Sequence, residues 1–320
     1  MKIYVIIIHY KGLKDTLNLL ENLLNLNYQD FQIVLINNNP SEDLKENLLK
    51  FFKDKNWSNE YYVERNNRII FGSYNLKYPI VLINQENKGY AGGVNTGLRY
   101  ALEKNDFSYV WILNNDLILD SSSLIELINY AEEKKKKGIK VGIIGSKLLY
   151  YWNPRIFQGI GGRFNKYLAL TSHIGGFEED KGQYDKEIYN IDYVIGACMF
   201  VPKEFILDVG LMDEKYFLYF EDLDWSERAK RKGYKLLYCW KSKVYHKEGE
   251  SIGSSSIGKE KSEIADYYWM RNRIIFTRKF YPQYLVFVYL SYLGVLINRI
   301  KRKQFKRVGL MFKAIKDSKC

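Results

Sequence analysis

Cysteine is scarce in this chain, and its few copies form no recognisable pattern. The 320 residues include only Cys198, Cys239 and Cys320, an odd number without any CxxC spacing. The spacing excludes the paired-cysteine metal and redox motifs, and the odd number argues against a disulfide scaffold. The sequence therefore predicts a protein of a reducing compartment, the cytoplasm.

Membrane-length apolar runs are lacking as well. The first apolar run ends before His9 and has no cleavage site after it, which favours a buried first strand over a signal peptide. The apolar stretch 284–297 would extend only about 21 Å as a helix, short of the roughly 30 Å of a bilayer core. The sequence therefore predicts no membrane-spanning segment.

The common phosphate-binding signatures are absent, because neither the P-loop pattern nor GxGxxG occurs, and no segment repeats at a fixed period. A different glycine-rich stretch, NKGYAGGVNTG at 87–97, lies between a predicted strand and a predicted helix. Glycine lets the backbone approach a ligand closely, and a helix N-terminus offers N–H groups to phosphate or sugar oxygens. The alternative is a tight turn followed by a closely packed helix.

The chain does contain an alternation of short apolar runs with helix-like stretches. The apolar runs lie at 3–8, 32–36, 79–83, 109–113 and 141–144, and helical spacing occurs at 14–26, 44–53, 94–104 and 122–137. This alternation predicts an α/β domain with a largely parallel sheet and helices on both faces. Ligands of such folds bind at the carboxyl ends of the strands, so the polar residues after the runs are the candidates for a site. They are His9 and Tyr10, Asn37 to Asn39, residues 84–93, and Asn114 to Asp116.

One candidate is a metal site. Asn114, Asn115 and Asp116 follow an apolar run, and a carboxylate there can hold Mg²⁺ or Mn²⁺, which neutralises a diphosphate. The alternative is an ordinary turn. His246 follows a later strand-like run and could complete the site with Asp116, although a lone histidine is more often structural; His173 has no such context.

A second candidate is the acidic cluster before the predicted helix 223–232. Glu221, Asp222 and Asp224 lie within four residues. A helix N-terminus helps to keep carboxylates ionised, and an ionised carboxylate can remove a proton from a hydroxyl group. The alternative is helix capping by Asp222 or Asp224.

The basic charge of the chain is concentrated at its C-terminus. Residues 263–320 carry 13 Lys and Arg but 3 acidic residues, so they contribute +10 of the net charge of +12. With the aromatic stretch 284–297, this favours a helix in the membrane interface, held on anionic lipid by Arg299 and the basic residues 301–303. The alternative is packing on the body or on a second subunit. The basic run 134–137 indicates a solvated helix end rather than a nucleic-acid site, and a Ser/Gly-rich segment at 249–258 is predicted to be a mobile loop.

In their order along the chain, several segments resemble glycosyltransferase family 2, which has the GT-A fold, and within it the bacterial rhamnosyltransferase branch. They are IYVIIIHYK, VLINNNPSED, NKGYAGGVNTG, NND, VIGACMFVP, YFEDLDWSERAKRKGY, VYHKEG and YYWMRNRIIFTRKFYP. The resemblance runs from residue 3 to about 280 and implies a catalytic domain at 1–262, with a nucleotide-binding half at 1–116 and an acceptor half at 117–262. Residues 263–320 form a helical extension in this division.

The resemblance also implies a chemistry, which is inverting transfer of L-rhamnose from dTDP-rhamnose to a cell-surface polysaccharide or lipid-linked glycan. Asp222 matches the family's general base, with Asp224 as the competing candidate and Glu221 beside them. Asp116 matches the last acid of the metal motif and His246 its late histidine, whereas Asn114 and Asn37 stand where the family has acids. The implied donor-binding residues are His9, Tyr10, Asn37, Asn39, Asn87, Lys88, Gly92, Gly93, Asn95, Asn114, Asn115 and Asp116.

Two other classes of protein fit part of the pattern. A sugar nucleotidyltransferase shares a nucleotide-binding α/β half, and a non-catalytic sugar-nucleotide or membrane-binding protein would tolerate Asn114 in the metal motif. The acidic cluster with His246 favours the glycosyltransferase. The expected partners are a nucleotide-sugar donor, a divalent metal, a glycan acceptor, the inner face of the cell membrane and, in one alternative, a second copy of the chain; no nucleic acid is expected.

Overall fold

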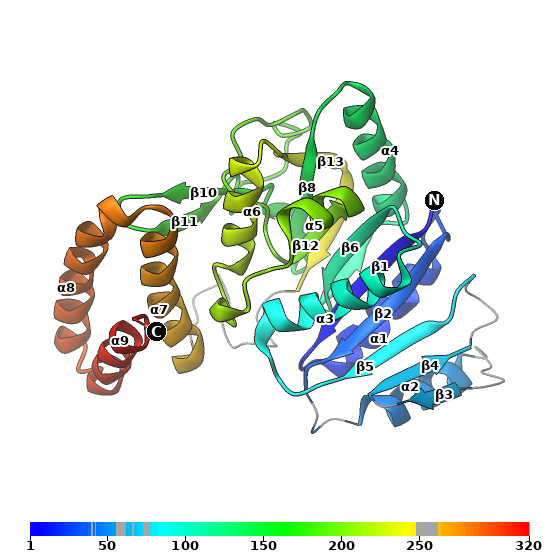
Figure 1. The fold of residues 1–320 in the computed structure, drawn as a ribbon, viewed down its shortest axis with the longest axis horizontal. Coiled ribbons are helices and arrows are strands. Elements are labelled where there is room, and N and C mark those ends of the chain that lie inside the picture. The colour runs from blue at the N-terminus through cyan, green and yellow to red at the C-terminus, as the bar shows by residue number, and fades with distance from the viewer. Residues whose placement is uncertain are drawn as a thin grey trace.

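The computed structural model describes residues 1–39, 41, 43–55, 62–65, 67–72, 77–247 and 262–319. The segment predicted to be a mobile loop, 249–258, and Cys320 lie outside these residues. The described part consists of an α/β body and three helices that stand together at one end of the molecule (Figure 1).

Four parallel strands form the centre of the main sheet, as the alternation predicts. They lie in the order β5 (Ile80–Asn84), β2 (Phe31–Asn37), β1 (Ile3–His9) and β6 (Tyr109–Asn114). The register pairs His9 with Asn37, Asn37 with Asn84, and Ile8 with Asn114. The carboxyl ends of these strands therefore meet at one edge of the sheet, with a polar residue at each end.

Strands of both directions extend this centre on both sides, so that eleven strands of the described residues form one mixed sheet. β12 (Cys198–Pro202) pairs antiparallel with β6 and is followed in the sheet by β8 (Val141–Tyr150), β13 (Lys235–His246) and β7 (Leu117–Leu119). β9 (Asn153–Gly159) pairs with β8, and the hairpin of β3 (Tyr62–Arg65) and β4 (Arg68–Phe71) continues the sheet beyond β5. β8 runs six residues past the predicted run at 141–144, because all ten of its residues are buried between neighbouring elements.

Helices cover both faces of the sheet, because alternate residues of each central strand face opposite sides. Val5 of β1 packs in one core with α1 (Leu13–Leu24), α2 (Leu44–Asp54) and α4 (Ser123–Lys136). Its neighbour Ile6 packs in the other core with α3 (Gly89–Lys104), α5 (Lys203–Val209) and α6 (Glu221–Arg231). The two cores confirm the predicted three-layer arrangement.

The glycine-rich stretch lies mostly inside α3, which begins at Gly89 rather than near residue 94. A Cβ atom on Gly97 would lie 2.5 Å from a methyl group of Ile6, and one on Gly93 would lie 3.1 Å from Ile8. Both distances are shorter than an ordinary van der Waals contact. These two glycines thus allow α3 to pack tightly on β1, which confirms the alternative interpretation of the motif.

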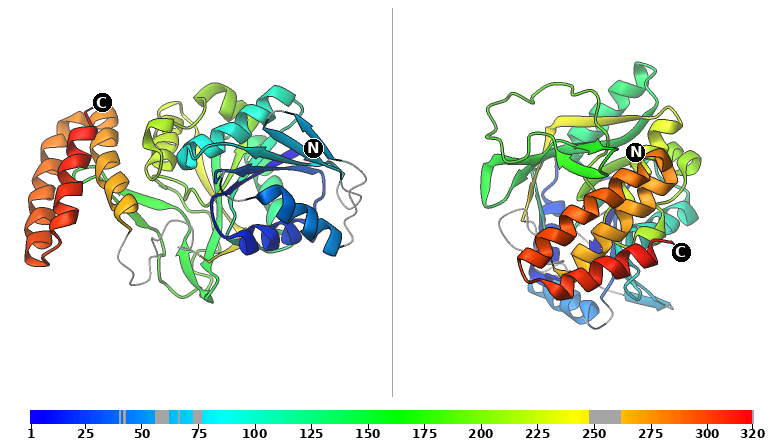
Figure 2. Two further views of the ribbon diagram at one scale, coloured as in Figure 1. Left: turned by 90° about the horizontal axis from the view of Figure 1, so that it is seen from below. Right: turned by 90° about the vertical axis from the view of Figure 1, so that its left-hand side faces the viewer.

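The C-terminal extension forms three packed helices rather than a single isolated one. They are α7 (Glu263–Phe280), α8 (Leu285–Lys301), entered through a short 3-10 helix (Pro282–Tyr284), and α9 (Phe305–Asp317). Met270, Val288 and Met311 meet in their shared core together with Ala169, which lies between β10 (Gly162–Asn165) and β11 (Leu170–His173). Figure 2 shows the three helices side by side, apart from the main sheet.

Two expectations about this extension need correction. Arg299 is buried and pairs with Asp266 at 2.6 Å, so it holds α8 on α7 and is not available to lipid. By length and composition, the helical stretch Pro282–Lys301 is also able to cross a membrane, because the helix extends beyond the predicted 284–297 at both ends. Only 17% of the apolar part of this stretch is buried in the protein.

Candidate active site

The polar residues at the carboxyl edge of the sheet bind one another. The Asn37 side chain donates to Asn84 Oδ1 at 3.0 Å and accepts from the Asn39 backbone N–H at 3.0 Å. Asn37 is buried, whereas Asn39 is half-buried. Of these two predicted donor-binding residues, Asn39 therefore presents more surface to a ligand.

Asn38, a candidate by its position after β2 but not one of the implied donor-binding residues, connects three elements. Its amide donates to Gly89 O at 2.8 Å, and its Oδ1 accepts from Gln85 at 2.6 Å. Gln85 in turn accepts from Thr96 Oγ1 at 2.6 Å. The contacts fix the end of β2 against the start of α3, and only the three-dimensional arrangement distinguishes Asn38 from its two neighbours.

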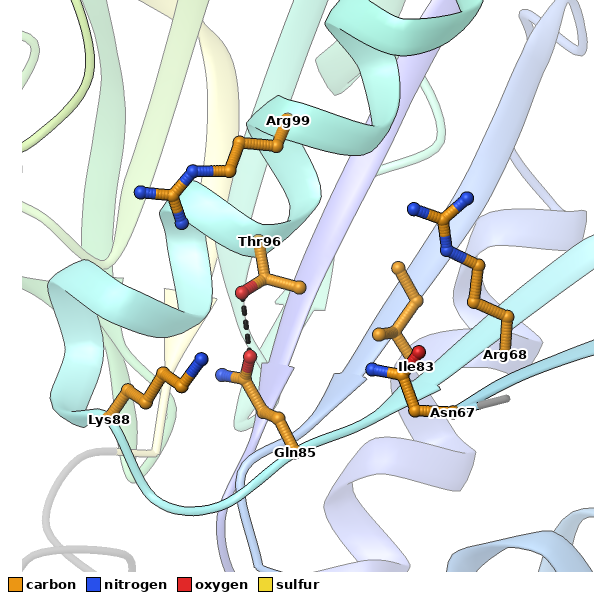
Figure 3. A pocket seen from close by; sticks show the side chains of 7 residues that line it. All are labelled: Asn67, Arg68, Ile83, Gln85, Lys88, Thr96 and Arg99. Carbon is orange, nitrogen blue, oxygen red and sulfur yellow. Dashed lines mark hydrogen bonds between the residues drawn. The ribbon is translucent and has the colours of Figure 1, made fainter. Parts of the chain in front are cut away.

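A recess of about 230 Å³ opens beside this network (Figure 3). Lys88 lines the recess and forms no ion pair with any described residue, whereas Arg68 pairs with Glu103 and Arg99 with Glu214. Figure 3 shows the bond between Gln85 and Thr96 within it. The remaining lining residues are Asn67 and Ile83. An exposed cation is thus placed next to the start of α3, as expected for Lys88.

His9 and Asn115 are buried and bind the same residue. His9 Nδ1 is hydrogen-bonded to Thr16 Oγ1 at 2.7 Å, and the Asn115 amide donates to the same oxygen at 2.9 Å and to Lys11 O at 2.7 Å. These contacts tie the loop after β1 to the turn after β6. Tyr10, which lies in that loop, is half-buried.

Asp116 and His246 are brought together, although 130 residues separate them in the chain. His246 Nε2 lies 3.1 Å from Asp116 Oδ1, and both side chains are buried. Burial raises the pKa of the Asp116 carboxyl, but the adjacent His246 outweighs it, so the net pKa lies below the usual range. The other ring nitrogen, Nδ1, lies 2.8 Å from Oε1 of buried Gln158, a partner with no signal in the sequence.

The pair fits a divalent cation in its chemistry. When Nδ1–H donates to Gln158, Nε2 directs a lone pair at the Asp116 carboxylate, and a cation between the two atoms would satisfy both. One carboxylate and one imidazole suit an ion that takes its other ligands from phosphates and water. Among the described residues, no group of three or more His, Cys, Asp or Glu side chains is positioned to hold a metal ion by itself.

The three carboxylates at the start of α6 have different surroundings. Asp224 is fully buried and is bound by Tyr216 at 3.0 Å, Arg228 at 2.7 Å and Lys279 at 2.6 Å. Glu221 is also buried, and its Oε2 has no hydrogen-bond partner among the described residues. Asp222 is the one of the three that keeps partial exposure.

Two backbone groups orient the Asp222 carboxylate. Gly196 N–H donates to Oδ2 at 3.1 Å, and Leu223 N–H donates to Oδ1 at 2.8 Å. Burial raises the pKa of Asp222 to about 6, against the lowering effect of these two donors. The carboxylate is therefore ionised at neutral pH, with a proton affinity suited to a general base.

Tyr90 of α3 lies in the candidate stretch 84–93 but was not one of the implied donor-binding residues. Its hydroxyl donates to the Gly196 carbonyl, beside Asp222. Burial raises the pKa of this phenol, and the charges of Glu221, Asp222 and Asp116 raise it further. Asn114 N–H donates to Ala197 O at 3.0 Å, so the carboxyl end of β6 and the Asp222 carboxylate both bind the segment 196–197.

Several other predicted residues have contacts within the protein. Asn95 is buried, and its amide donates to Met212 O at 2.9 Å while its Oδ1 accepts from Met212 N–H at 2.9 Å, so it ties α3 to the segment before α6. Asn87 accepts from Gly89 N–H at 2.9 Å. Gly92 packs against Lys88, because a Cβ there would lie 2.4 Å from that side chain, and Asn114 is half-buried.

A mostly parallel sheet with a polar carboxyl edge, and a half-buried carboxylate beside it, define an α/β domain that binds and acts on a small polar ligand. The family model of glycosyl transferase family 2 matches residues 4–191, more than half of the chain. The chain therefore belongs to glycosyl transferase family 2. Asp222 and His246 lie beyond the matched residues, so their roles depend on geometry.

Two relatives are similar in sequence. The low-salt glycan biosynthesis hexosyltransferase Agl10 of Haloferax volcanii is 23% identical over 216 residues, which cover 66% of this chain and 64% of that protein. The poly-beta-1,6-N-acetyl-D-glucosamine synthase of Staphylococcus aureus is 25% identical over 237 residues, 71% of this chain and 46% of the relative. The matches thus span less than two thirds of each relative.

A crystal structure of S. aureus TarS is similar in fold. The TM-score is 0.52 at 13% identity, over 86% of this chain and 39% of that chain. The likeness agrees with the predicted GT-A fold, a mixed α/β domain followed by helices.

Proposed function

We propose that this chain is an inverting glycosyltransferase that moves a sugar from a nucleotide-diphosphate donor to a glycan acceptor, with Asp222 as the general base. The observation that carries the proposal is the exposure of Asp222, because Glu221 and Asp224 are buried and Asp224 is already bound by three donors. The names of the two relatives, a glycan biosynthesis hexosyltransferase and a polysaccharide synthase, agree with this class of reaction.

The proposed reaction assigns one step to each part of the site. Asp222 accepts the proton of an acceptor hydroxyl, the oxygen bonds to the anomeric carbon from the opposite side, and the bond to the diphosphate breaks with inversion. Asp116 and His246 would hold Mg²⁺ or Mn²⁺, which when bound stabilises the charge of the departing diphosphate. Tyr90 fixes the Gly196 backbone that in turn orients Asp222.

The donor and the acceptor are assigned by chemistry and by likeness. The predicted donor-binding residues that keep exposed surface at the edge of the sheet are Tyr10, Asn39, Asn87, Lys88 and Asn114. L-rhamnose carried on dTDP is the donor that the motif resemblance favours. The acceptor is a polysaccharide or lipid-linked glycan at the inner face of the cell membrane, which the C-terminal helices contact.

Replacement of Asp222 tests this function. With a panel of nucleotide sugars and Mg²⁺ or Mn²⁺, Asp222→Asn should reduce transfer by about 10²- to 10⁴-fold, the usual contribution of a general base. Donor binding followed by calorimetry should persist. Asp54→Asn, which changes an exposed carboxylate on α2, should leave both unchanged.

The products separate the competing functions. Release of a nucleoside diphosphate from a sugar nucleotide supports glycosyl transfer, and release of pyrophosphate from a nucleoside triphosphate would instead identify a nucleotidyltransferase. Donor binding without turnover in the unmodified protein, with every donor and acceptor tested, would favour a non-catalytic binding protein.

A further inference from the structure

The segment that leads into α6 has an unfavourable backbone conformation. Phe217, Tyr219 and Phe220 have φ angles of 58°, 66° and 74°, in the left-handed region that side chains other than glycine rarely adopt. At Phe217 the ψ angle is −53°, and Leu218 N–H donates to Tyr216 O at 2.5 Å. This is the rare, strained form of the γ-turn. We call residues 216–220 the base loop, because Asp222 follows it in the first turn of α6.

Such a conformation persists only where surrounding groups determine it. One set of contacts comes from the start of α3, where Tyr90 N–H donates to Phe217 O at 2.7 Å. A Cβ atom on Gly89 would lie 2.1 Å from the same oxygen, so this approach requires glycine. The base loop is therefore held against the glycine-rich stretch.

The second set of contacts comes from a single side chain of the C-terminal helices. Asn272 on α7 is fully buried, and its amide nitrogen donates to the carbonyl oxygens of Tyr216 at 2.7 Å, Leu218 at 2.8 Å and Tyr219 at 2.9 Å. Its Oδ1 accepts from Arg271 at 3.0 Å. Three carbonyl oxygens around one atom require that this atom be the NH₂ group, which fixes the orientation of the amide.

We propose that Asn272 is a positioning residue for Asp222, holding the base loop in the conformation that sets the carboxylate against Gly196 and the substrate. The proposal rests on the assignment of Asp222 as the base. The side chain contributes through its hydrogen-bond donors, since the three carbonyls of a strained turn would otherwise face one another without a donor between them. In this proposal the C-terminal helices help to position the catalytic base, in addition to any contact with a membrane.

Two substitutions with the same branched shape test the hydrogen-bond donors of the side chain. Asn272→Asp places a carboxylate against three carbonyl oxygens, and Asn272→Leu removes the donors without adding charge. The matched control is Thr277→Val, because Thr277 lies on the same helix, is also fully buried, and donates only to Arg273 O of its own helix at 2.7 Å.

The expected result is a change in turnover rather than in donor affinity. Both Asn272 variants should lower kcat on the order of 100-fold, which is the usual effect of a misplaced catalytic group, with donor KM within about two-fold. The pH midpoint of kcat/KM should move upward. When the base loop shifts, the Asp222 carboxylate loses the hydrogen bonds from Gly196 N–H and Leu223 N–H, and this loss raises its proton affinity. Thr277→Val should change neither quantity. If Asn272→Asp does not fold, as judged by its thermal melt, Asn272→Leu decides.

The experiment separates failure of this proposal from failure of the proposed function. If Asp222→Asn keeps full turnover, the base assignment fails, and the base loop is then judged by amide hydrogen exchange at residues 217–222 of the Asn272 variants. Faster exchange at these residues than in Thr277→Val supports the proposal that Asn272 holds the base loop. Unchanged exchange, or an unchanged kcat and pH midpoint while Asp222→Asn is inactive, would overturn it.

Discussion

Two aspartates in the first turn of α6 differ in their exposure and in their hydrogen-bond partners. Asp222 keeps partial exposure and accepts two backbone hydrogen bonds, whereas Asp224, two residues on, is enclosed by Tyr216, Arg228 and Lys279. Helical geometry turns the two side chains to different sides of α6. Asp222 therefore keeps partial contact with solvent, and the enclosed Asp224 joins α6 to α7 through Lys279.

The pH dependence of the reaction should report the Asp222 carboxyl. Burial raises its pKa to about 6, and only the ionised form can accept a proton, so kcat/KM should rise with pH to a plateau with a midpoint near 6. The titratable groups facing Asp222 are Glu221, Tyr90 and Tyr193. Burial raises the pKa of all three and the charge of Asp222 raises it further, so both phenols stay neutral in this range. Steady-state rates at saturating metal, from pH 5 to about 8, measure the midpoint. A flat profile would contradict the assignment, and the residual rate of Asp222→Asn should lack this step.

At the scale of elements, the start of α3 is the point where the sheet, the base loop and the recess meet. Gly89 permits the contact with Phe217 O, Gly93 and Gly97 permit close packing on β1, and Asn95 ties the helix to Met212. A motif that suggested phosphate binding therefore serves first to bring α3 close to its neighbours. The site is assembled by this packing.

A pair of glycine substitutions isolates that contact. Gly89 and Gly138 both have a φ of +73°, but a Cβ on Gly138 meets nothing within 4 Å, whereas one on Gly89 meets backbone oxygen. Gly138→Ala should cost only about 1–2 kcal/mol for the left-handed conformation, and Gly89→Ala more than that because the base loop must move. Urea denaturation measures both. Equal losses in the free energy of unfolding would show that the base loop can move away from residue 89 without a further loss of stability.

At the scale of the whole molecule, the C-terminal helices leave an apolar surface uncovered. Val286, Leu290, Leu293 and Ile297 of α8 are each 55–57% exposed, on one face of the helix, while Val288 and Tyr292 pack inward. The exposed basic residues Lys301, Arg302 and Lys303 follow at its end. An apolar face beside basic residues fits the surface of an anionic membrane.

Vesicle binding tests that surface in the full-length chain. The combined change Leu290→Ser, Leu293→Ser and Ile297→Ser should weaken binding to phosphatidylglycerol vesicles on the order of 100-fold, since three large side chains lose their apolar contact. Leu207→Ser, which changes a residue of α5 that is 65% exposed, is the control. Unchanged vesicle binding, with a dimer that dissociates in the triple variant, would instead identify this face as a subunit contact.

The elements of the sheet centre and its largely parallel character could be read from the sequence, because they follow from the alternation of apolar runs and helical stretches. Period-two burial and helical spacing depend on the residues within each segment, so the strands ending at His9, Asn37 and Asn114 were predictable. Membership of the family followed from motif order. The long course of β8 and the antiparallel β12 were not predictable, because they depend on neighbouring strands.

Only the tertiary structure shows which polar residues keep exposed surface and which are buried with partners inside the protein. Asp222 and Asp224 look alike in sequence, as do Asn37, Asn38 and Asn39, and only burial and bond partners separate them. The contacts of Asn272 and Gln158 join residues that are 53 or more positions apart. Hydrogen bonds act over about 3 Å in space, whatever the separation along the chain, so no local pattern records them.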